Sequence, residues 1–259
     1  MTTKHSTNSE LDRIFADLIR IQEEDPSGTD LLQYRSLATA HQYGLLYRTL
    51  TQYLKPDSSI LDWGCGNGHF SFGLLELGYR TAGFSFEDFR IRPLLRSGYR
   101  FSLGSPSDPR ALPYEDETFQ GVTSVGVLEH VRETGGTEAG SLREIFRVLE
   151  PGGFFICFHL PNRFSLIEVS NAAIPGKHHH LYRYDSATIH ELCRQAGFSL
   201  VEVRRYGALP RNVCHRLPAR LRNSGLFAKL WNKSDDFLSM LSSPFCQNYL
   251  FVAQKPRTS

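Results

Sequence analysis

Hydrophobic residues near the start of the chain recur at helical spacing. One helical face is formed by five apolar residues: Leu11, Ile14, Phe15, Leu18 and Ile19. They stand at i, i+3, i+4, i+7 and i+8, which predicts an amphipathic helix. Asp25-Pro26 ends this pattern, because proline cannot continue a helix. A second helical stretch with several tyrosines is predicted over about 31–54.

From residue 58 onward the period changes to short apolar runs separated by helical patterns. Strands are predicted over 58–65, 81–86, 99–103, 119–126, 154–160, 199–203 and 249–253. Helices are predicted over 69–77, 88–96, 138–149 and 186–196, with Pro151-Gly152-Gly153 ending the third of them. Alternating strands and helices are typical of a parallel sheet covered on both faces. The sequence therefore predicts an α/β protein with a doubly wound sheet.

Composition narrows the class of protein. The 259 residues are 41% hydrophobic and 22% charged, which excludes a disordered, fibrous or coiled-coil chain. This length predicts one large domain, or one domain with substantial additions. The net charge of +2 indicates no particular partner.

The cysteines and the apolar runs bear on location. The five cysteines include no CxxC pair, which is typical of reduced intracellular thiols. The first ten residues are polar, and the longest nearly apolar run, 154–160, is far shorter than the ~18 residues of a membrane span. We therefore expect a cytoplasmic protein that neither is exported nor spans a membrane.

Three glycines follow the first predicted strand and precede a predicted helix. They alternate with other residues in Gly64-Cys65-Gly66-Asn67-Gly68. Glycine allows a tight turn and a close approach of a ligand to the backbone, and the helix that follows offers unpaired N–H groups. An anionic or zwitterionic nucleotide-like ligand is expected here, although a tight turn without a ligand has the same pattern. A dinucleotide-binding fingerprint would need a third glycine where His69 stands, which disfavours an NAD-dependent oxidoreductase.

The surrounding segments resemble the class I S-adenosylmethionine-dependent methyltransferases. Four of them carry the resemblance: ILDWGCGNGHF, DPRALPYEDETFQGV, VLEHV and LREIFRVLEPGGFFICFHLPN. It covers about 58–207 and the last strand, and VLEHV is similar to the O-methyltransferases of ubiquinone biosynthesis. The resemblance implies a Rossmann-like, mostly parallel seven-stranded sheet with an antiparallel last strand. It divides the chain into an N-terminal helical cap over 1–57 and a methyltransferase domain over 58–259, with a helical insertion at about 208–246.

The resemblance also implies a cofactor, S-adenosyl-L-methionine, and the residues that bind it. These are Asp62, Gly64, Cys65, Gly66, Asn67, Gly68, Ser85, Phe86, Asp108, Pro109, Arg110, Gly126 and Val127. The glycines would pass the methionine portion, with Asp62 near its ammonium group, and Asp108 would lie beside the adenine amino group. Each aspartate could instead be an ordinary turn cap.

The sequence departs from the family pattern at the end of the second strand. Ser85 stands where the family usually has an acid that holds both ribose hydroxyls, and Gln120 replaces another common acid. Either Ser85 makes a weaker contact, or Glu87 or Asp88 supplies the carboxylate, or cofactor affinity is reduced. A cofactor-binding module without catalytic activity is therefore an alternative to an enzyme.

Methyl transfer is an in-line displacement, which needs a base only if the acceptor must lose a proton. His130 and His159, at the ends of the fourth and fifth strands, are the candidate bases. His178, Tyr182 and Arg183 are candidate substrate contacts, because this fold usually places an acceptor loop there. No metal is expected. The consecutive imidazoles 178–180 cannot all face one way, and a cation held by Glu129, His130 and Glu133 is disfavoured.

The segment 203–233 carries eight Arg and Lys residues and no acidic residue. Leu226, Phe227, Leu230 and Trp231 share one helical face within it. Either the helix packs this face on the sheet edge with its basic side in solvent, or it binds an anionic or lipid-linked acceptor at a membrane surface. The sequence contains no Asp/Asn-Pro-Pro-Tyr/Phe tetrapeptide of base-methylating DNA enzymes, so we expect a small-molecule or lipid-linked acceptor and no nucleic acid. O-methylation is the favoured reaction, with nitrogen and carbon acceptors left open.

Overall fold

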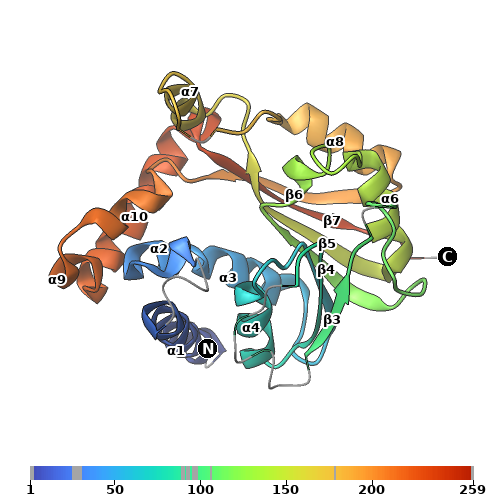
Figure 1. Cartoon of the computed structure of the whole chain (residues 1–259), viewed down its shortest axis with the longest axis horizontal. Helices are drawn as coiled ribbons and strands as arrows, with labels where there is room; N and C mark the ends of the chain where they lie inside the picture. Colours follow the sequence, from blue (N-terminus) through green and yellow to red (C-terminus); the bar gives the residue numbers. More distant parts are fainter. Residues whose placement is uncertain are drawn as a thin grey trace.

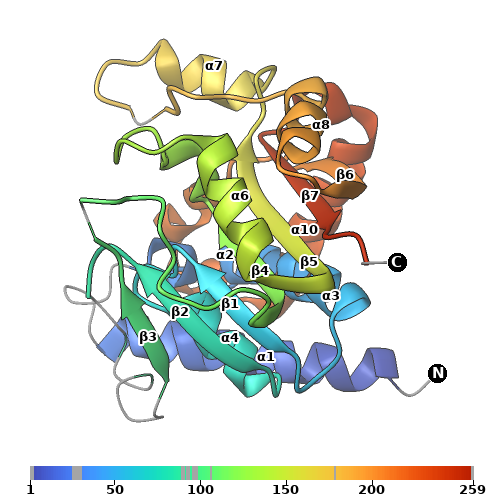
Figure 2. The same cartoon turned by 90° about the vertical axis from the view of Figure 1, so that its right-hand side faces the viewer.

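The computed structural model describes residues 3–24, 31–88, 91, 94, 99–105, 107–177 and 179–257. Its centre is a seven-stranded sheet with the order β3-β2-β1-β4-β5-β7-β6, which Figure 2 shows from β3 to β6. The strands are β1 Ser59–Trp63, β2 Arg80–Ser85, β3 Arg100–Leu103, β4 Phe119–Val125, β5 Leu149–Pro161, β6 Ser199–Tyr206 and β7 Asn248–Gln254. The pairs from β3 to β5 are parallel, whereas β7 is antiparallel to both β5 and β6. This confirms the predicted Rossmann-like sheet with an antiparallel last strand.

Helices cover both faces of the sheet (Figure 1). Before β1 come α1 Thr3–Glu24, η1 Leu32–Tyr34, α2 Leu37–Gln42 and α3 Gly44–Tyr53, and α4 His69–Glu76 follows β1. Between β4 and β6 lie η2 Leu128–His130, α6 Glu138–Val148, α7 Leu166–Ala172 and α8 Ser186–Gln195. Between β6 and β7 lie η3 Arg211–Arg216, α9 Ala219–Arg222, α10 Gly225–Leu241 and η4 Ser243–Phe245.

Successive side chains of the central strands point to opposite faces of the sheet, where they pack against the two layers of helices. In β5, Phe155 and Cys157 belong to the core under α6 and α8. Ile156 and Phe158 belong to the opposite core, with residues of α1, α3 and α4. Each fully buried large apolar side chain stabilises the fold by roughly 1.5–3 kcal/mol. The sheet is therefore a rigid platform for the groups at its carboxyl edge.

The structure differs from the predicted elements in two places, and a third predicted element is not tested. The helical stretch 31–54 is interrupted, because Ser36 caps a new helix and Gly44 follows a break at Tyr43. β5 begins at Leu149, so the Pro-Gly-Gly turn lies within an irregular start of that strand and not before it. The helix predicted over 88–96 lies outside the described residues, apart from Asp88 and the buried Ile91 and Leu94.

The segment between β6 and β7 corrects a further expectation. α10 packs against α2, beside which it lies in Figure 1, and its buried residues are Ala228, Asp235 and Ser239. Phe227 and Trp231 pack partly against this contact. Leu226 and Leu230 are instead 70% and 57% exposed. The predicted apolar face is thus divided: Phe227 and Trp231 pack toward α2 and η3, whereas Leu226 and Leu230 are exposed. α10 also contacts the edge strand β6, but the predicted face is not buried as a whole against the sheet edge.

Candidate functional site

The glycine turn after β1 has the backbone conformation that only glycine adopts readily. Gly64, Gly66 and Gly68 have φ angles of +74°, +53° and +81°. A Cβ on Gly64 would lie 2.4 Å from Cγ2 of Val127, whereas a Cβ on Gly66 would meet no atom within 4 Å. The turn therefore packs tightly against Val127 on one side and is open at Gly66.

A cavity of about 230 Å³ lies in front of this turn. Its lining comes from the ends of β1, β2 and β4 and the segments after them: Trp63, Gly64, Gly66, Phe84, Ser85, Phe86, Glu87, Pro109, Gly126, Val127, His130, Val131 and Thr134. Seven of the predicted cofactor-binding residues and the candidate base His130 are in this lining. Parallel α/β sheets bind their ligands at this carboxyl edge.

Asp62 lies beneath the turn and not in the lining of the cavity. Ser71 Oγ donates a hydrogen bond of 2.6 Å to its Oδ2, and Thr123 Oγ1 lies 3.4 Å from its Oδ1. Burial raises the pKa of Asp62 to about 6, although these hydrogen bonds lower it. The carboxyl group is thus fixed under the glycines.

The other turn residues outside the lining are Cys65, Asn67 and Gly68. Cys65 is buried, Asn67 Oδ1 lies 2.8 Å from Nδ1 of His69, and Gly68 is the N-cap of α4. Burial lowers the pKa of His69 to about 4, so this imidazole is neutral near pH 7. These residues shape the turn and the start of α4.

Near Ser85, where the family usually has an acidic residue, the cavity is also lined by Glu87. Ser85 and Glu87 both line the cavity, and the backbone N–H of Glu87 donates to Ser85 Oγ at 3.4 Å. Of the three residues considered for the ribose contact, Ser85 and Glu87 line the cavity and Asp88 does not. A ribose contact of either residue stays a prediction.

Asp108 and Arg110 are exposed and bracket Pro109, which lines the cavity. The backbone N–H of Arg110 donates to Asp108 Oδ1 at 3.3 Å, so the aspartate shapes its own turn. An adenine contact of Asp108 stays a prediction.

His159 has a strained backbone and aromatic neighbours. Its φ angle is +61°, which is unfavourable for any residue other than glycine. The hydroxyl oxygen of Tyr206 lies 2.6 Å from Nδ1 of His159 and accepts a hydrogen bond from its backbone N–H at 2.9 Å. The ring of Tyr43 lies 5.4 Å from the imidazole. A Cβ on Gly126 would lie 3.9 Å from Cβ of His159, so residue 159 is adjacent to Gly126 of the cofactor cavity but does not itself line that cavity.

The acceptor loop brings a different histidine to the site than the sequence indicated. His178 lies outside the described residues, Arg183 is exposed, and Tyr182 packs under the guanidinium of Arg132 at 4.7 Å. His180 instead approaches His130, with ring centroids 5.7 Å apart. No spacing rule could have found this pair, because 50 positions separate its members.

A second and larger cavity, of about 770 Å³, lies between α3, β6 and α10. Three arginines line it: Arg48, Arg204 and Arg205. Tyr206 lines it too and contacts His159 through its hydroxyl group. His159 thus has one neighbour in each cavity, Tyr206 in the arginine-lined cavity and Gly126 in the cofactor cavity.

The strand order, the glycine turn and the cavity at the carboxyl edge define a Rossmann-like nucleotide-binding protein of the class I methyltransferase type. A family model described as a methyltransferase domain matches residues 34–203. The chain belongs to this family, as a class I S-adenosylmethionine-dependent methyltransferase, and S-adenosylmethionine is its cofactor.

Curated relatives include a demethylmenaquinone methyltransferase from Symbiobacterium thermophilum, which is 31% identical over 132 residues, or 44% of this chain and 47% of that protein. A sterol 24-C-methyltransferase from Schizosaccharomyces pombe is 31% identical over 121 residues, or 44% of this chain and 30% of that protein. The chain thus spans less than half the length of either relative.

Solved structures share the fold. A SAM-dependent methyltransferase from Archaeoglobus fulgidus has a TM-score of 0.54 at 18% identity, covering 82% of this chain and 94% of that chain. The 1,6-didemethyltoxoflavin-N1-methyltransferase from Burkholderia thailandensis, solved with S-adenosylhomocysteine, has a TM-score of 0.54 at 18% identity. The match covers 97% of this chain and 90% of that chain.

Proposed function

We propose that this protein transfers a methyl group from S-adenosylmethionine to an oxygen atom of an anionic, amphipathic acceptor. The observation that carries the proposal is the arginine-lined cavity whose Tyr206 contacts His159 beside the cofactor cavity. Two relatives are named for demethylmenaquinone and for carbon 24 of a sterol, which supports a lipid-like acceptor here but does not bear on the choice of an oxygen atom.

The charge of the larger cavity supports an anionic group on the acceptor. Arg204 pairs with Glu202 at 2.7 Å, Arg205 donates to the hydroxyl of Tyr249 at 2.9 Å, and Asp236 is the acidic residue of the lining. Burial lowers the pKa of Arg48, although Asp236 raises it. Three guanidinium groups stand against two carboxylates, Asp236 in the lining and Glu202 beside Arg204, and this excess of positive charge favours a phosphate or carboxylate in the cavity.

We assign the role of base to His159 and not to His130, because His159 contacts Tyr206 of the arginine-lined cavity. A hydroxyl acceptor would lose its proton to the imidazole as its oxygen forms the new bond to the methyl carbon and the bond from that carbon to sulfur breaks. The neutral thioether would then leave as S-adenosylhomocysteine. Tyr206 would orient the imidazole through its contact with Nδ1, and the strained backbone of His159 is typical of functional positions.

The surface of α10 supports contact with an anionic membrane. Its exposed side carries Leu226, Leu230, Phe237, Met240 and Leu241. The segment 203–233 has eight basic and no acidic residues; two of the eight, Lys229 and Lys233, belong to α10, which also carries Asp235 and Asp236. Such a helix inserts apolar side chains at the lipid boundary while its cations meet phosphate groups. Because Met240 also lines the arginine-lined cavity, an acceptor could enter from the lipid surface. Among the described residues, no helix is both long and apolar enough to cross a bilayer.

The reaction is tested with methyl-labelled S-adenosylmethionine and a panel of acidic lipids that carry either a free hydroxyl or a free amine. We expect the label in a methyl ether or methyl ester of the hydroxyl lipids. In Arg204→Ala the KM for the lipid should rise about tenfold, which corresponds to a loss of ~1.4 kcal/mol of binding free energy. Arg194→Ala is the matched control, because Arg194 is exposed on α8 and pairs with Glu191. Label on the amine alone contradicts O-methylation. Binding of the cofactor without transfer to any lipid would favour the non-catalytic module.

Membrane contact is tested by sedimentation with vesicles of phosphatidylglycerol or of phosphatidylcholine. We expect binding to the anionic vesicles alone and its loss in Leu230→Glu. Val201→Glu is the control, because Val201 is an exposed apolar residue of β6. Equal loss in both variants, or equal binding to both lipids, would contradict the contact.

A further inference from the structure

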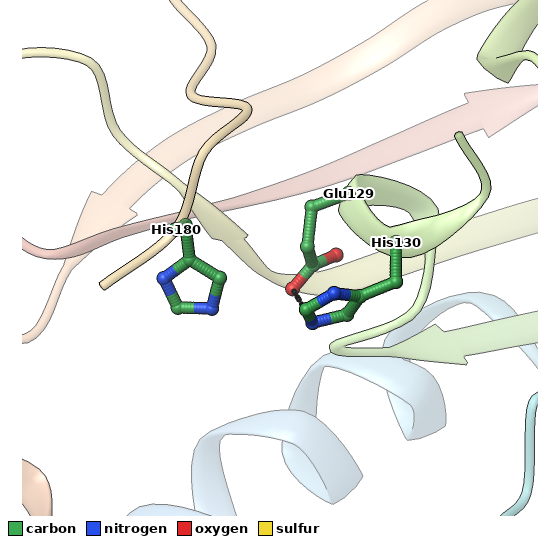
Figure 3. A group of neighbouring side chains, drawn as sticks. All are labelled: Glu129, His130 and His180. Carbon is green, nitrogen blue, oxygen red and sulfur yellow. Dashed lines mark ion pairs between the residues drawn. The ribbon is translucent and has the colours of Figure 1, made fainter. Parts of the chain in front are cut away.

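Two imidazoles and a carboxylate converge beside the cofactor cavity. Glu129 and His130 belong to η2 after β4, and His180 comes from the loop before α8. One possible ligand atom from each lies within 4.8 Å of the others, and Figure 3 shows the three side chains turned toward one another. Residues from two distant segments thus supply two nitrogen donors and one oxygen donor.

Each imidazole is oriented by a further carboxylate. Nδ1 of His130 lies 3.0 Å from Oε1 of Glu133, and Nδ1 of His180 lies 3.1 Å from Oε2 of Glu168. Glu168 also accepts the backbone N–H of His180 at 2.9 Å. With Nδ1 engaged in each ring, Nε2 is the donor atom for a ligand. Histidines that bind metal ions are typically held in this way, by a carboxylate on the other ring nitrogen.

Burial and charge at the cluster also fit a cation. The side chains of Glu129 and Glu168 are each only 2% exposed. Buried carboxylates are stabilised by a bound positive charge.

We propose that Glu129, His130 and His180 bind one divalent transition-metal ion of the zinc type. Two imidazole nitrogens and one carboxylate oxygen form a donor set that suits such an ion better than magnesium or calcium. Tetrahedral ligands at 2.0–2.1 Å from zinc stand about 3.4 Å apart, so the donors must move inward by about 1 Å. His130 can supply this movement, since its side chain is 38% exposed.

The site differs from the cation site that the sequence disfavoured. Glu133 orients His130 here and is not a ligand, and His180 takes its place. Because His130 also lines the cofactor cavity, an ion bound to it would lie beside that cavity. If the proposed function holds, the ion would hold the acceptor oxygen; metal binding itself does not depend on that function.

The experiment is calorimetric titration of Zn²⁺ and Co²⁺ into the full chain, stripped with a chelator and carrying no affinity tag. We expect one ion per chain, with affinity reduced about tenfold or more in Glu129→Gln, His180→Ala and Glu168→Gln, because loss of an orienting carboxylate typically costs 10–100-fold. The visible absorption of bound Co²⁺ should change in the same variants.

The matched control is His179→Ala, because His179 is the exposed neighbour of His180 and contacts the backbone of Lys177. Its affinity for Zn²⁺ should equal that of the wild type. S-adenosylhomocysteine titrated into each variant shows that the fold and cofactor site persist, which separates this test from failure of the proposed function. Absence of saturable binding in the wild type would overturn the proposal, as would equal losses in His179→Ala and His180→Ala, which would indicate chelation by the histidine run.

Discussion

Replacing Gly66 by valine separates backbone strain from ligand contact. Gly66 has a φ of +53° and lines the cofactor cavity, and a Cβ there would meet no protein atom within 4 Å. Gly78, at the end of α4, has a φ of +82° and equally open surroundings, but it is not among the residues that line this cavity. The two positions therefore share the strain and differ only in what the new side chain faces.

The magnitudes follow from these geometries. A left-handed conformation costs a non-glycine residue roughly 1–2 kcal/mol, and each kcal/mol lowers Tm by about 2–4 °C in a domain of this size. Gly66→Val and Gly78→Val should therefore lose similar stability. Only Gly66→Val places methyl groups in the 230 Å³ cavity, and it should weaken S-adenosylhomocysteine binding about 100-fold, or ~2.8 kcal/mol.

The assay is calorimetric titration of S-adenosylhomocysteine into the wild type and both variants, with thermal unfolding of each. Because the strain is matched, it cannot explain a difference in affinity between the variants. If Gly66→Val binds the ligand as tightly as Gly78→Val, the glycine turn is not the cofactor site.

Further predictions concern three buried or strained side chains. The raised pKa of Asp62, about 6 against 3.8, means that the folded wild type loses stability as pH rises from about 4 to 6. The free energy of unfolding of Asp62→Asn, measured in urea, should therefore rise relative to that of the wild type by on the order of 3 kcal/mol across that window. The variant should also bind the cofactor more weakly. If the difference in unfolding free energy between variant and wild type is the same at pH 4 and pH 7, the prediction is contradicted. His159→Gly should be about 1 kcal/mol more stable than His159→Ala, because glycine accepts the positive φ of residue 159, and equal stabilities would argue against the strain. The pKa of Glu168 is lowered to about 2 from 4.5, so its contribution to stability is complete above pH 4.5 and is lost as pH falls toward 2. The stability of Glu168→Gln, followed by circular dichroism, should therefore fall less steeply with decreasing pH than that of the wild type.

Local patterns were enough to predict the strands, the parallel part of the sheet and the glycine turn, whereas the antiparallel last strand was implied only by the family resemblance. Each strand is a short apolar run, and the alternation of helices and strands restricts the topology to a doubly wound sheet. The turn was recognisable because Gly64, Gly66 and Gly68 follow one another at fixed spacing after a strand. Such signals lie within a few residues of one another, and the tertiary fold preserves them.

The contacts between distant segments could not be predicted in this way. His180 reaches His130 across a loop, and Tyr206 reaches His159 from another strand. The orientation of α10 was also missed, because its contact with α2 uses Ala228 and leaves Leu230 exposed, against the usual preference for burying the larger apolar residue. Each of these contacts depends on which surfaces of the folded chain meet. No local pattern in a single sequence predicts such a contact.

The central claim is that the turn after β1 holds the cofactor next to His159 and the arginine-lined cavity. A crystal structure of the protein grown with S-adenosylhomocysteine tests it most directly. We predict the amino-acid portion of the ligand against Gly64 and Gly66, its ribose near Glu87, and its sulfur beside Gly126 on the side that leads to His159. A ligand bound elsewhere, or a turn left empty at saturating ligand, would contradict the account.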